Sequence, residues 1–502
     1  MLSRCRDGVQ ASGGHMALTE SACVFKMIWK KTAGISEGRE VWNMPGRRHS
    51  RKDRRKESMQ IRLPGTVKTI LNTLHHAGYE AYAVGGCVRD SLLHRVPDDW
   101  DITTSARPEQ VKALFSHTVD TGIEHGTVTV LIGSKTHEVT TYRIDGKYED
   151  CRHPENVTFT ASLKEDLKRR DFTINAMAYN EEEGLIDLYG GLKDLEAGVI
   201  RCVGPAEERF SEDALRILRA VRFSAQLDFS IDRDTLAGVI LLAPNLEKIS
   251  AERICTELTK LIVSDHPEYL KVAYEAGITK VILPEFDAMM QTPQNNPHHR
   301  YNVGEHTLAA MRAIQNRRLL RFTMLLHDMG KPSCRTTDAD GVDHFFGHGP
   351  KGAEIAEKVM RRLKMDNDTI RKTVKLIYYH DWWIRPEEAE VRKAVCVIGK
   401  ELFPAWLKVQ DADAMAQSEY QREEKLTRII RVAQLYDKII GEGQCVSLDG
   451  LAVSGKDLLD AGVPRGPEIG RNLQKALELV LKDQSKNRKD ILLKELGVAG
   501  RN

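Results

Sequence analysis

Apolar residues recur along this chain with two different periods, which divide it into an early part of alternating helices and strands and a later part that is mostly helical. Residues 63–80, LPGTVKTILNTLHHAGYE, predict a helix because four apolar side chains fall on one face, namely Val67, Ile70, Leu71 and Leu74. Runs of β-branched and aromatic residues predict strands in YEAYAVG, DDWDITTS, HGTVTVLIG and KTHEVTTYRI. The segments CVRDSLLHR and RPEQVKALFSH predict helices between them.

Beyond about residue 200 the strand pattern nearly disappears. The segments AEERFSEDALRILRAVRFSAQL and SAERICTELTKLIVS have helical period, as do most later segments. The pattern therefore predicts an α+β protein, with a small mixed sheet in an N-terminal head and helices in every later domain. We expect an N-terminal extension followed by four domains: extension 1–58, head 59–200, neck 201–270, body 271–420 and tail 421–502.

The first 58 residues lack periodicity and end in the basic run GRRHSRKDRRKE. Such a run is found in RNA-binding or targeting arms. It is equally typical of a disordered tail, or of translation from a start upstream of the natural one, since periodic sequence begins directly at Met59. We favour a disordered tail or an upstream start over an RNA-binding or targeting arm.

The overall composition is typical of a globular protein but does not identify a binding partner. The 502 residues are 41% hydrophobic and 29% charged, and the net charge of +2 means that any nucleic acid must be bound by local basic patches. The nine cysteines are scattered without a C-x-x-C pair, which predicts reduced thiols in a cytoplasmic protein and no zinc finger. The longest apolar runs are too short to span a membrane.

The stretch GGCVRDSLLHRVPDDWD, residues 85–101, carries the first candidate chemistry. In a strand, side chains two residues apart share a face, so Asp99 and Asp101 would together hold Mg²⁺ for phosphoryl or nucleotidyl transfer. Asp98 would fall on the opposite pleat, and Glu138 of the neighbouring strand is either a third carboxylate or an ordinary exposed strand residue. A lone D-x-D pair is common by chance, so its context decides.

That context is a strand, two glycines and a helix. Gly85 and Gly86 leave backbone N–H groups open to a triphosphate, because no Cβ blocks the approach. Arg89 in the first helical turn could contact a phosphate or the ribose. This combination resembles a polymerase-β-like nucleotidyltransferase.

Two further segments could bind the rest of a nucleotide. In LKRRDFTINAMAYN, Asp171 and Asn175 are spaced to share a helix face and bond ribose hydroxyls, or simply to cap that helix. In ERFSEDALRILRAVRF, one helix would place Asp213 beside Arg216. A carboxylate next to a guanidinium matches the pairing edges of cytosine and adenine and clashes with those of uracil and guanine. The ordinary alternative is a solvated face of ion pairs.

Together these motifs resemble the bacterial class II tRNA nucleotidyltransferases, or CCA-adding enzymes, over about residues 60–262. The resemblance implies template-independent addition and repair of the 3′-terminal CCA of tRNA from CTP and ATP, with release of pyrophosphate. It implies Mg²⁺ on Asp99 and Asp101. It also implies a set of nucleotide-binding residues, namely Gly85, Gly86, Arg89, Arg170, Asp171, Asn175, Asp213, Arg216, Arg219 and Arg222.

The same resemblance leaves alternatives within the superfamily. Enzymes that add only CC lack a flexible loop that RIDGKYEDCRHPENVTF, residues 143–159, would supply here. Poly(A) polymerases and A-adding enzymes share the first motifs, and the intact EDALR sequence argues against a poly(A) polymerase.

A second constellation lies in GEHTLAAM, LLHDMGKP, GHGPKGA, YYHD and VQDADAMAQ. Histidines and aspartates at these separations suit a divalent metal. The pattern resembles an HD phosphohydrolase domain over about residues 300–415. The resemblance implies four ligands: His306, His327, Asp328 and Asp413, with Asp411 a weaker candidate for the last.

In that resemblance His348 and His380 are candidates for a second metal or for phosphate contact, whereas His298, His299 and His344 are not ligands. The domain would either hydrolyse a phosphoester, such as a cyclic phosphate at a damaged tRNA end, or serve as a helical scaffold. A rival function makes this domain the working part and the head an RNA-docking module. The Lys- and Arg-rich helices of residues 471–496 could follow the tRNA acceptor stem and T arm, or form a solvated face.

Overall fold

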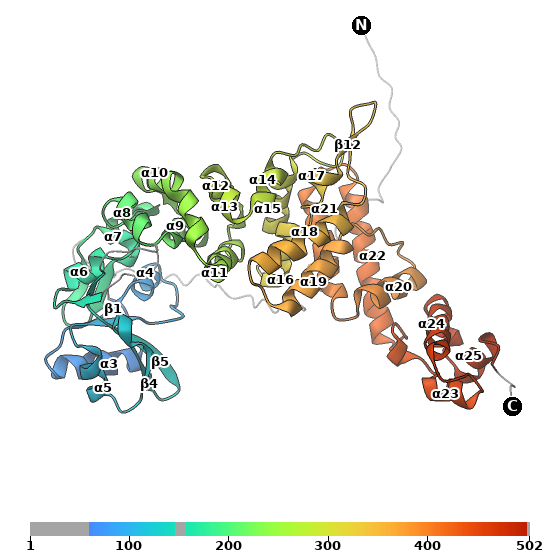
Figure 1. The fold of residues 1–502 in the computed structure, drawn as a ribbon, viewed down its shortest axis with the longest axis horizontal. Coiled ribbons are helices and arrows are strands. Elements are labelled where there is room, and N and C mark those ends of the chain that lie inside the picture. The colour runs from blue at the N-terminus through green and yellow to red at the C-terminus, as the bar shows by residue number, and fades with distance from the viewer. Residues whose placement is uncertain (1–59, 146–156, 499–502) are drawn as a thin grey trace, which may run out of the picture. The chain divides into compact units, whose positions relative to one another are not determined.

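The structure is a computed structural model that describes residues 60–145 and 157–498, all within one compact unit of the chain (Figure 1). The predicted extension 1–58 and most of the predicted loop 143–159 lie outside the described residues. The strands that border this loop, β6 (Arg143–Asp145) and β7 (Val157–Phe159), pair antiparallel.

The head is built on a seven-stranded mixed sheet with the order β3-β4-β5-β2-β1-β8-β9. Strands β2 and β5 run parallel, and the other neighbours run antiparallel. The strands are β1 (Ala81–Val84), β2 (Ile102–Thr104), β3 (Thr118–Gly122), β4 (Thr127–Ile132), β5 (Lys135–Thr141), β8 (Met177–Asn180) and β9 (Gly184–Asp187). The head helices are α3 (Gly65–His76), α4 (Gly86–Leu92), α5 (Pro108–Leu114), α6 (Leu163–Lys168) and α7 (Gly191–Ala197). The predicted mixed sheet is confirmed.

Two local predictions in the head are wrong. Strand β2 begins at Ile102, so Asp99 and Asp101 precede the strand instead of lying in it. No helix spans Asp171 to Asn175: α6 ends at Lys168, and a single 3₁₀ turn leads into β8. All four residues of β8 are buried beside β1, which shows that sheet pairing outweighed the local helical spacing.

The neck contains α8 (Ala206–Glu212), α9 (Leu215–Leu227), α10 (Arg233–Leu242) and α11 (Ala251–Ile262). The single helix predicted over α8 and α9 is wrong, because Asp213 adopts an extended backbone between them. The Asp213 carboxylate accepts a hydrogen bond from the Leu215 N–H at 3.0 Å. An aspartate that satisfies a free N–H at a helix start favours exactly this kind of interruption.

The body and tail are helical, as predicted. Their helices are α12 (Leu270–Glu275), α13 (Ile278–Ile282), α14 (Pro284–Met290), α15 (Val303–Ala313), α16 (Arg318–Leu326), α17 (Lys331–Cys334), α18 (His348–Arg362), α19 (Asn367–Tyr378), α20 (Glu388–Ile398), α21 (Phe403–Ala416), α22 (Arg422–Gly441), α23 (Gly455–Asp460), α24 (Pro467–Lys482) and α25 (Lys489–Glu495). Short strand pairs join β10 (Val199–Ile200) to β11 (Ser230–Ile231) and β12 (Thr336–Thr337) to β13 (Asp343–His344).

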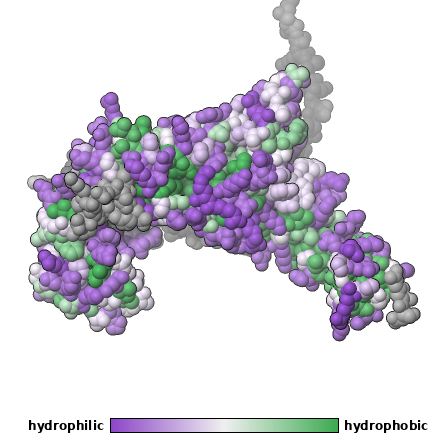
Figure 2. Space-filling view, viewed as in Figure 1, coloured by the Kyte–Doolittle hydropathy of each residue, from purple (hydrophilic) through white to green (hydrophobic). Residues whose placement is uncertain are grey.

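The hydrophobic core is divided along the chain. One large cluster extends from the head through the neck to α21, and a second joins α19 to α22. A third has its buried residues within 445–498, and a small fourth one lies in the head, around Tyr82 and Tyr142. Polar and charged residues cover most of the face shown in Figure 2. Among the described residues, no helix combines the length and the apolar character needed to cross a bilayer.

Candidate active site and metal centre

Three carboxylates come together beside the end of β1. The backbone carbonyl of Asp101 accepts the Val84 N–H at 3.0 Å, which fixes Asp101 next to Gly85. Trp100 is buried while Asp99 and Asp101 are exposed, so the expected alternation holds although the strand starts later. Ile102 pairs with Val139 across the parallel strands, which brings Asp101 level with Glu138.

Charge repulsion couples Asp101 and Glu138 to the neighbouring carboxylates. Asp101 reaches solvent but is partly surrounded by protein atoms, and this partial burial raises its pKa. The charge of Arg170 opposes the rise in pKa, and the charge of Asp99 adds to it. Burial, followed by the charges of Asp101 and Asp99, raises the pKa of Glu138. Mutual repulsion between carboxylates is relieved by a divalent cation. Their ligand atoms are not among the described groups of three within 4.8 Å, so a shared ion would require a side-chain adjustment.

The glycine turn brings two guanidinium groups against its backbone. Gly85 has a φ of +83°, and a Cβ built there would lie 3.1 Å from Nη1 of Arg170. Nη1 of Arg89 donates to Oδ1 of Asn175 at 2.6 Å, and its Nη2 pairs with Asp90 at 2.8 Å. Arg170 in turn pairs with the buried Asp166 at 3.4 Å. Cations beside an open glycine turn suit the binding of phosphate groups.

Asp171 and Asn175 meet as predicted, although no helix carries them. Nδ2 of Asn175 donates to Oδ1 of Asp171 at 3.1 Å, and Arg219 pairs with Oδ2 of Asp171 at 2.5 Å. Burial would raise the pKa of Asp171, but the charge of Arg219 and these hydrogen bonds outweigh it and lower the pKa. A continuous polar chain therefore links Arg89 at the glycine turn to α9.

Glu257 on α11 completes this chain, and the sequence motifs did not single it out. Its Oε2 lies 2.5 Å from Nε of Arg222, and its Oε1 lies 3.9 Å from Nη1 of Arg219. Burial lowers the pKa of Arg222 to about 10, and Glu257 opposes that shift. One buried carboxylate thus compensates two of the arginines that the sequence placed at the nucleotide.

Asp213 and Arg216 each have a different ionic partner. Asp213 pairs with Arg253 of α11 at 2.8 Å, and Arg216 pairs with Glu212 at 2.6 Å. Nη2 of Arg216 also donates to the Arg169 carbonyl at 2.9 Å. The interruption at Asp213 turns the two side chains to different partners, so the predicted helical juxtaposition is not what the structure shows.

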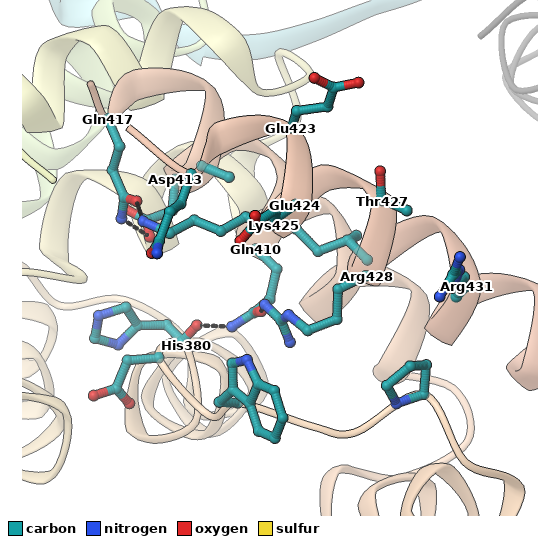
Figure 3. Close-up of a pocket in the computed structure, with 16 residues that line it drawn as sticks. His380, Gln410, Asp413, Gln417, Glu423, Glu424, Lys425, Thr427, Arg428 and Arg431 are labelled. Atoms are coloured by element: carbon teal, nitrogen blue, oxygen red, sulfur yellow. Dashed lines mark hydrogen bonds between the residues drawn. The ribbon is translucent and has the colours of Figure 1, made fainter. Parts of the chain in front are cut away.

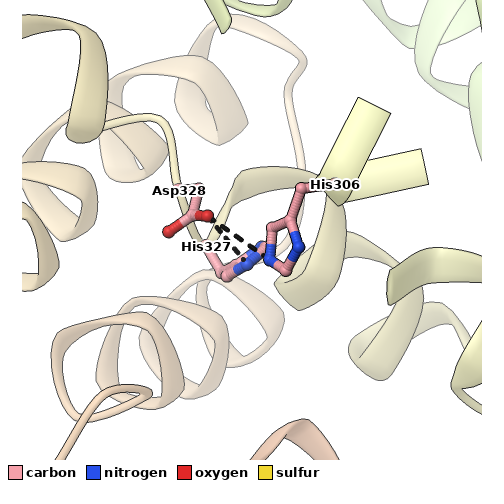
Figure 4. A group of neighbouring side chains, drawn as sticks. All are labelled: His306, His327 and Asp328. Atoms are coloured by element: carbon pink, nitrogen blue, oxygen red, sulfur yellow. Dashed lines mark ion pairs between the residues drawn. The ribbon is translucent and has the colours of Figure 1, made fainter. Parts of the chain in front are cut away.

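The histidines and aspartates of the body converge on Asp328 (Figure 4). On one side, Nε2 of His327 lies 3.3 Å and Nε2 of His306 lies 3.6 Å from Oδ2 of Asp328. Oδ1 of Asp413, from α21, lies 2.8 Å from Nε2 of His306. On the other side, Nε2 of His380 and His348 lie 3.5 and 3.6 Å from Oδ1 of Asp328. The four predicted ligands and both further histidines thus form one centre.

This centre fits a divalent metal on two counts. Nδ1 of His327, His348 and His380 each lies 2.7–2.8 Å from a backbone carbonyl, which turns the Nε2 atoms toward Asp328. Nζ of Lys331 lies 2.8 Å from Oδ2 of Asp328, whereas Oδ1 of Asp328 and Nε2 of His327 are buried without a hydrogen-bond partner. Buried polar atoms in such a state indicate a missing ligand.

The protonation of the centre responds to the same geometry. Burial lowers the pKa of His327, but Asp328 and Asp413 outweigh it and raise the pKa to about 10. A metal would therefore compete with a proton for Nε2, and its affinity should fall as the pH drops below about 10.

The three histidines predicted to be outside the ligand set have other surroundings. His344 pairs with Asp338 at 2.7 Å, and His298 stacks edge-on against Tyr420. The ring of His299 lies 5.2 Å from that of His306, but His299 belongs to neither group of candidate ligands. Asp411 also lies outside both groups.

Comparisons with known proteins bear on the whole chain. Three family models match, described as the poly A polymerase head domain at residues 81–201, a probable RNA- and SrmB-binding site of polymerase A at 228–290, and a putative tRNA nucleotidyltransferase domain 2 at 351–496. A CCA-adding enzyme of Limosilactobacillus reuteri is 55% identical over 201 residues, which make up 40% of this chain. The chain therefore spans about half (50%) of the length of that relative.

A CCA-adding enzyme of Lactobacillus delbrueckii subsp. bulgaricus is 37% identical over 419 residues, which cover 83% of this chain and 93% of that protein. The chain belongs to the family of CCA-adding enzymes. Its α+β fold, with a polymerase-β-like head and a helical remainder, is that of the family.

Solved CCA-adding enzymes share this architecture. The Bacillus stearothermophilus CCA-adding enzyme in complex with CTP is 30% identical, with a TM-score of 0.65 over 86% of this chain and 96% of that one. The Thermotoga maritima CCA-adding enzyme complexed with tRNA is 20% identical with a TM-score of 0.55 over 88% of this chain and 98% of that one, and it shows the fold alone. The matched family models do not describe an HD domain, so that interpretation rests on the side-chain geometry around Asp328.

Proposed function

We propose that this member of the CCA-adding family builds and repairs the 3′-terminal CCA of tRNA from CTP and ATP and releases pyrophosphate. The observation that carries the proposal is the group of Asp99, Asp101 and Glu138 beside the Gly85 turn. The family membership supports it. A tRNA substrate also favours a cytoplasmic location.

The residues divide the work along the bound nucleotide. Asp99 and Asp101, with Glu138 as a third carboxylate, would hold Mg²⁺, which neutralises charge that develops on the reacting phosphate. Arg89 and Arg170 are placed to bind the triphosphate at the glycine turn. The tRNA 3′-hydroxyl oxygen then bonds to the α-phosphorus as the bond to the β-phosphate bridging oxygen breaks.

Asp171 and Asn175 lie between the glycine turn and α9, where a ribose would follow the phosphates. Arg219 and Arg222 are held at the same level by Asp171 and Glu257. Asp213 and Arg216 would recognise the base after they exchange Arg253 and Glu212 for its pairing edge. Each assignment remains a proposal for the residue named.

Analysis of the reaction products on a gel tests the main proposal. Purified protein, Mg²⁺ and labelled CTP or ATP are incubated with tRNA that lacks CCA and with tRNA that ends in CC. We expect two C residues and one A on the first substrate and one A on the second. Addition of A to the CC-ended substrate with no addition to the CCA-less one would identify an A-adding enzyme, and long A tails on mixed RNA without CTP would identify a poly(A) polymerase.

Removal of the base-recognising carboxylate should relax selectivity. In Asp213→Ala, incorporation of UMP and GMP relative to CMP should rise about tenfold or more, because unpaired polar groups no longer penalise the wrong edge. The measurement is the ratio of kcat/KM values for the four nucleotides. Asp234→Ala, which removes an exposed carboxylate from α10, is the control. Unchanged ratios together with a lower Tm would leave Asp213 only a structural role.

Substitution at the glycine turn should affect triphosphate binding specifically. Gly85→Ala forces a φ of +83° and brings a Cβ within 3.1 Å of Arg170, so the KM for CTP should rise along with a loss of about 1–3 kcal/mol in stability. Gly466→Ala imposes a comparable backbone strain (φ +143°) where no atom lies within 4 Å of the added Cβ. That control should lose stability without a change in KM; equal KM values in both variants would contradict the assignment.

We propose a second activity, metal-dependent hydrolysis of a phosphoester, for the centre around Asp328. The buried Oδ1 of Asp328, which has no hydrogen-bond partner, favours it, since a scaffold alone would not retain it. His306, His327, Asp328 and Asp413 would hold a divalent metal, which supplies an activated water when bound. A cyclic phosphate at a damaged tRNA end is the substrate we propose. Hydrolysis lost in His327→Ala with CCA addition retained would support two separate activities, whereas CCA addition lost in the same variant would support the rival in which the head only docks RNA.

A further inference from the structure

A cavity of about 770 Å³ opens directly beside the centre around Asp328 (Figure 3). It is lined by the end of α21, the first turns of α22 and the segment 380–386 that follows α19. Both His380, one of the candidate ligands around Asp328, and Asp413, whose Oδ1 lies 2.8 Å from Nε2 of His306, also line the cavity. A molecule in this cavity would therefore present one end to the proposed metal ligands.

Arg428 is the cation best placed to hold that molecule. Its Nη2 donates to Oε1 of Gln410 at 3.1 Å, whereas its Nε and Nη1 are buried and have no hydrogen-bond partner. The Gln410 amide in turn donates to the His380 carbonyl, which ties Arg428 to the centre. A guanidinium with two unused N–H groups is suited to a phosphate.

A second cation and an aromatic ring share the cavity. Nζ of Lys425 lies 2.5 Å from Oε1 of Gln417, and burial lowers its pKa. The indole of Trp383 is 64% exposed, and Cζ of Arg428 lies 5.8 Å from the centre of its ring. An exposed indole beside a guanidinium is a platform on which a nucleobase can stack.

The cavity also carries carboxylates that restrict its ligand. Asp381, Glu423 and Glu424 contribute to the lining, and Figure 3 shows Glu423 directed away from His380 and Arg428. With acidic groups nearby, a polyanion such as a triphosphate would be repelled. The balance favours a single phosphate near Arg428.

We propose that this cavity binds a nucleoside monophosphate, free or at the end of an RNA strand, with the base on Trp383 and the phosphate on Arg428 and Lys425. The phosphate then faces His380 and Asp413. The inference rests on the hydrolase activity proposed above and names the ligand class of that centre: a nucleotide with one phosphate, which is what remains when a cyclic phosphate at a tRNA end is opened. The binding groups belong to the chain itself, so binding should not require a metal.

Tryptophan fluorescence tests the proposal on the full chain in EDTA. Titration with AMP should quench emission saturably, and Trp383→Phe should remove that quench while an aromatic platform remains. Arg428→Gln should raise the apparent Kd for AMP about tenfold or more. Arg371→Gln, an exposed arginine of α19 that pairs with Asp368, should leave the Kd unchanged. A quench that persists in Trp383→Phe, or an unchanged Kd in Arg428→Gln, would overturn the proposal.

Further probes identify the source of the phosphate. Adenosine should bind about tenfold or more weakly than AMP, because it lacks the group that Arg428 holds. A short RNA with a 3′-phosphate that quenches more strongly than the same RNA with a 3′-hydroxyl assigns the RNA end as ligand. Quenching by AMP but by neither RNA assigns the free nucleotide. Equal binding of adenosine and AMP would overturn the phosphate site.

The outcomes for the cavity and for the hydrolase are separable. Hydrolysis of 2′,3′-cyclic AMP is assayed with added Mn²⁺, Ni²⁺ or Mg²⁺ on the same preparation. Turnover without Trp383-dependent quenching by AMP would retain the hydrolase and reject the cavity as its substrate site. Quenching without turnover would retain the nucleotide site and reject the hydrolase.

Discussion

Replacement of Asp101 by asparagine should lower the incorporation of CMP into CCA-less tRNA by roughly 10³-fold or more, because the amide cannot supply the negative charge that Mg²⁺ needs. The substitution keeps the size and the outward direction of a side chain that lies beside the Gly85 turn. The measurement is single-turnover incorporation at saturating CTP.

The same variant should not be less stable than the parent in EDTA at pH 7. Burial and Asp99 raise the pKa of Asp101 in the folded state, so ionisation of this group costs stability once the pH exceeds its unfolded pKa near 4. The neutral amide removes that cost, and its Tm should equal or exceed that of the parent. Asp98→Asn, the same change at an exposed residue three positions earlier, should retain activity within about threefold. Normal incorporation by Asp101→Asn would remove the basis of the nucleotidyltransferase proposal.

Replacement of Asp328 by asparagine should abolish metal retention by the body, because this one carboxylate belongs to both groups of candidate ligands. It also leaves Lys331, 2.8 Å away, and His327 without their buried counter-charge. Loss of one partner from a buried ion pair costs about 3–5 kcal/mol, so the Tm should fall clearly. Metal content after gel filtration, measured by elemental analysis, separates the two effects.

The matched control is Asp411→Asn, two residues before Asp413 and outside both ligand groups. It should keep both metal and Tm, since burial alone raises the pKa of Asp411 and the amide avoids that penalty. His306→Ala should lose metal with a smaller change in Tm. Full metal content in Asp328→Asn would show that the metal is bound without this carboxylate, and no metal in the parent would show that the centre is held together by protons and hydrogen bonds alone.

The head could be predicted well from sequence where one local rule dominates. β-branched runs identified β4 and β5, and alternation placed Trp100 inside with Asp99 and Asp101 outside. Periodicity failed at Asp213, where a side-chain cap interrupts an otherwise regular helical pattern. It failed again at Asp171, whose surroundings are set by β8 and α9 instead of by neighbouring residues.

Partner choice is the part of the site that no local pattern contains. Arg253 and Glu257 lie on α11, two helices beyond α9, yet they pair with Asp213 and with Arg222. Only the packing of α11 against α9 reveals these pairs. The metal centre was easier, because histidine and aspartate are informative residue types even when their distances are unknown. The carbonyls that orient its imidazoles could not be foreseen, since every residue has one.

The occupied state of Asp213 and Arg216 has a consequence for fidelity. Before any nucleotide arrives, each group already has a satisfactory opposite charge in Arg253 or Glu212. The pairing edge of cytosine or adenine can replace these two ionic partners, whereas the pairing edge of uracil or guanine cannot. An incorrect nucleotide would therefore be rejected as it enters, because it could not displace Arg253 and Glu212. It would leave before its phosphates are aligned for reaction.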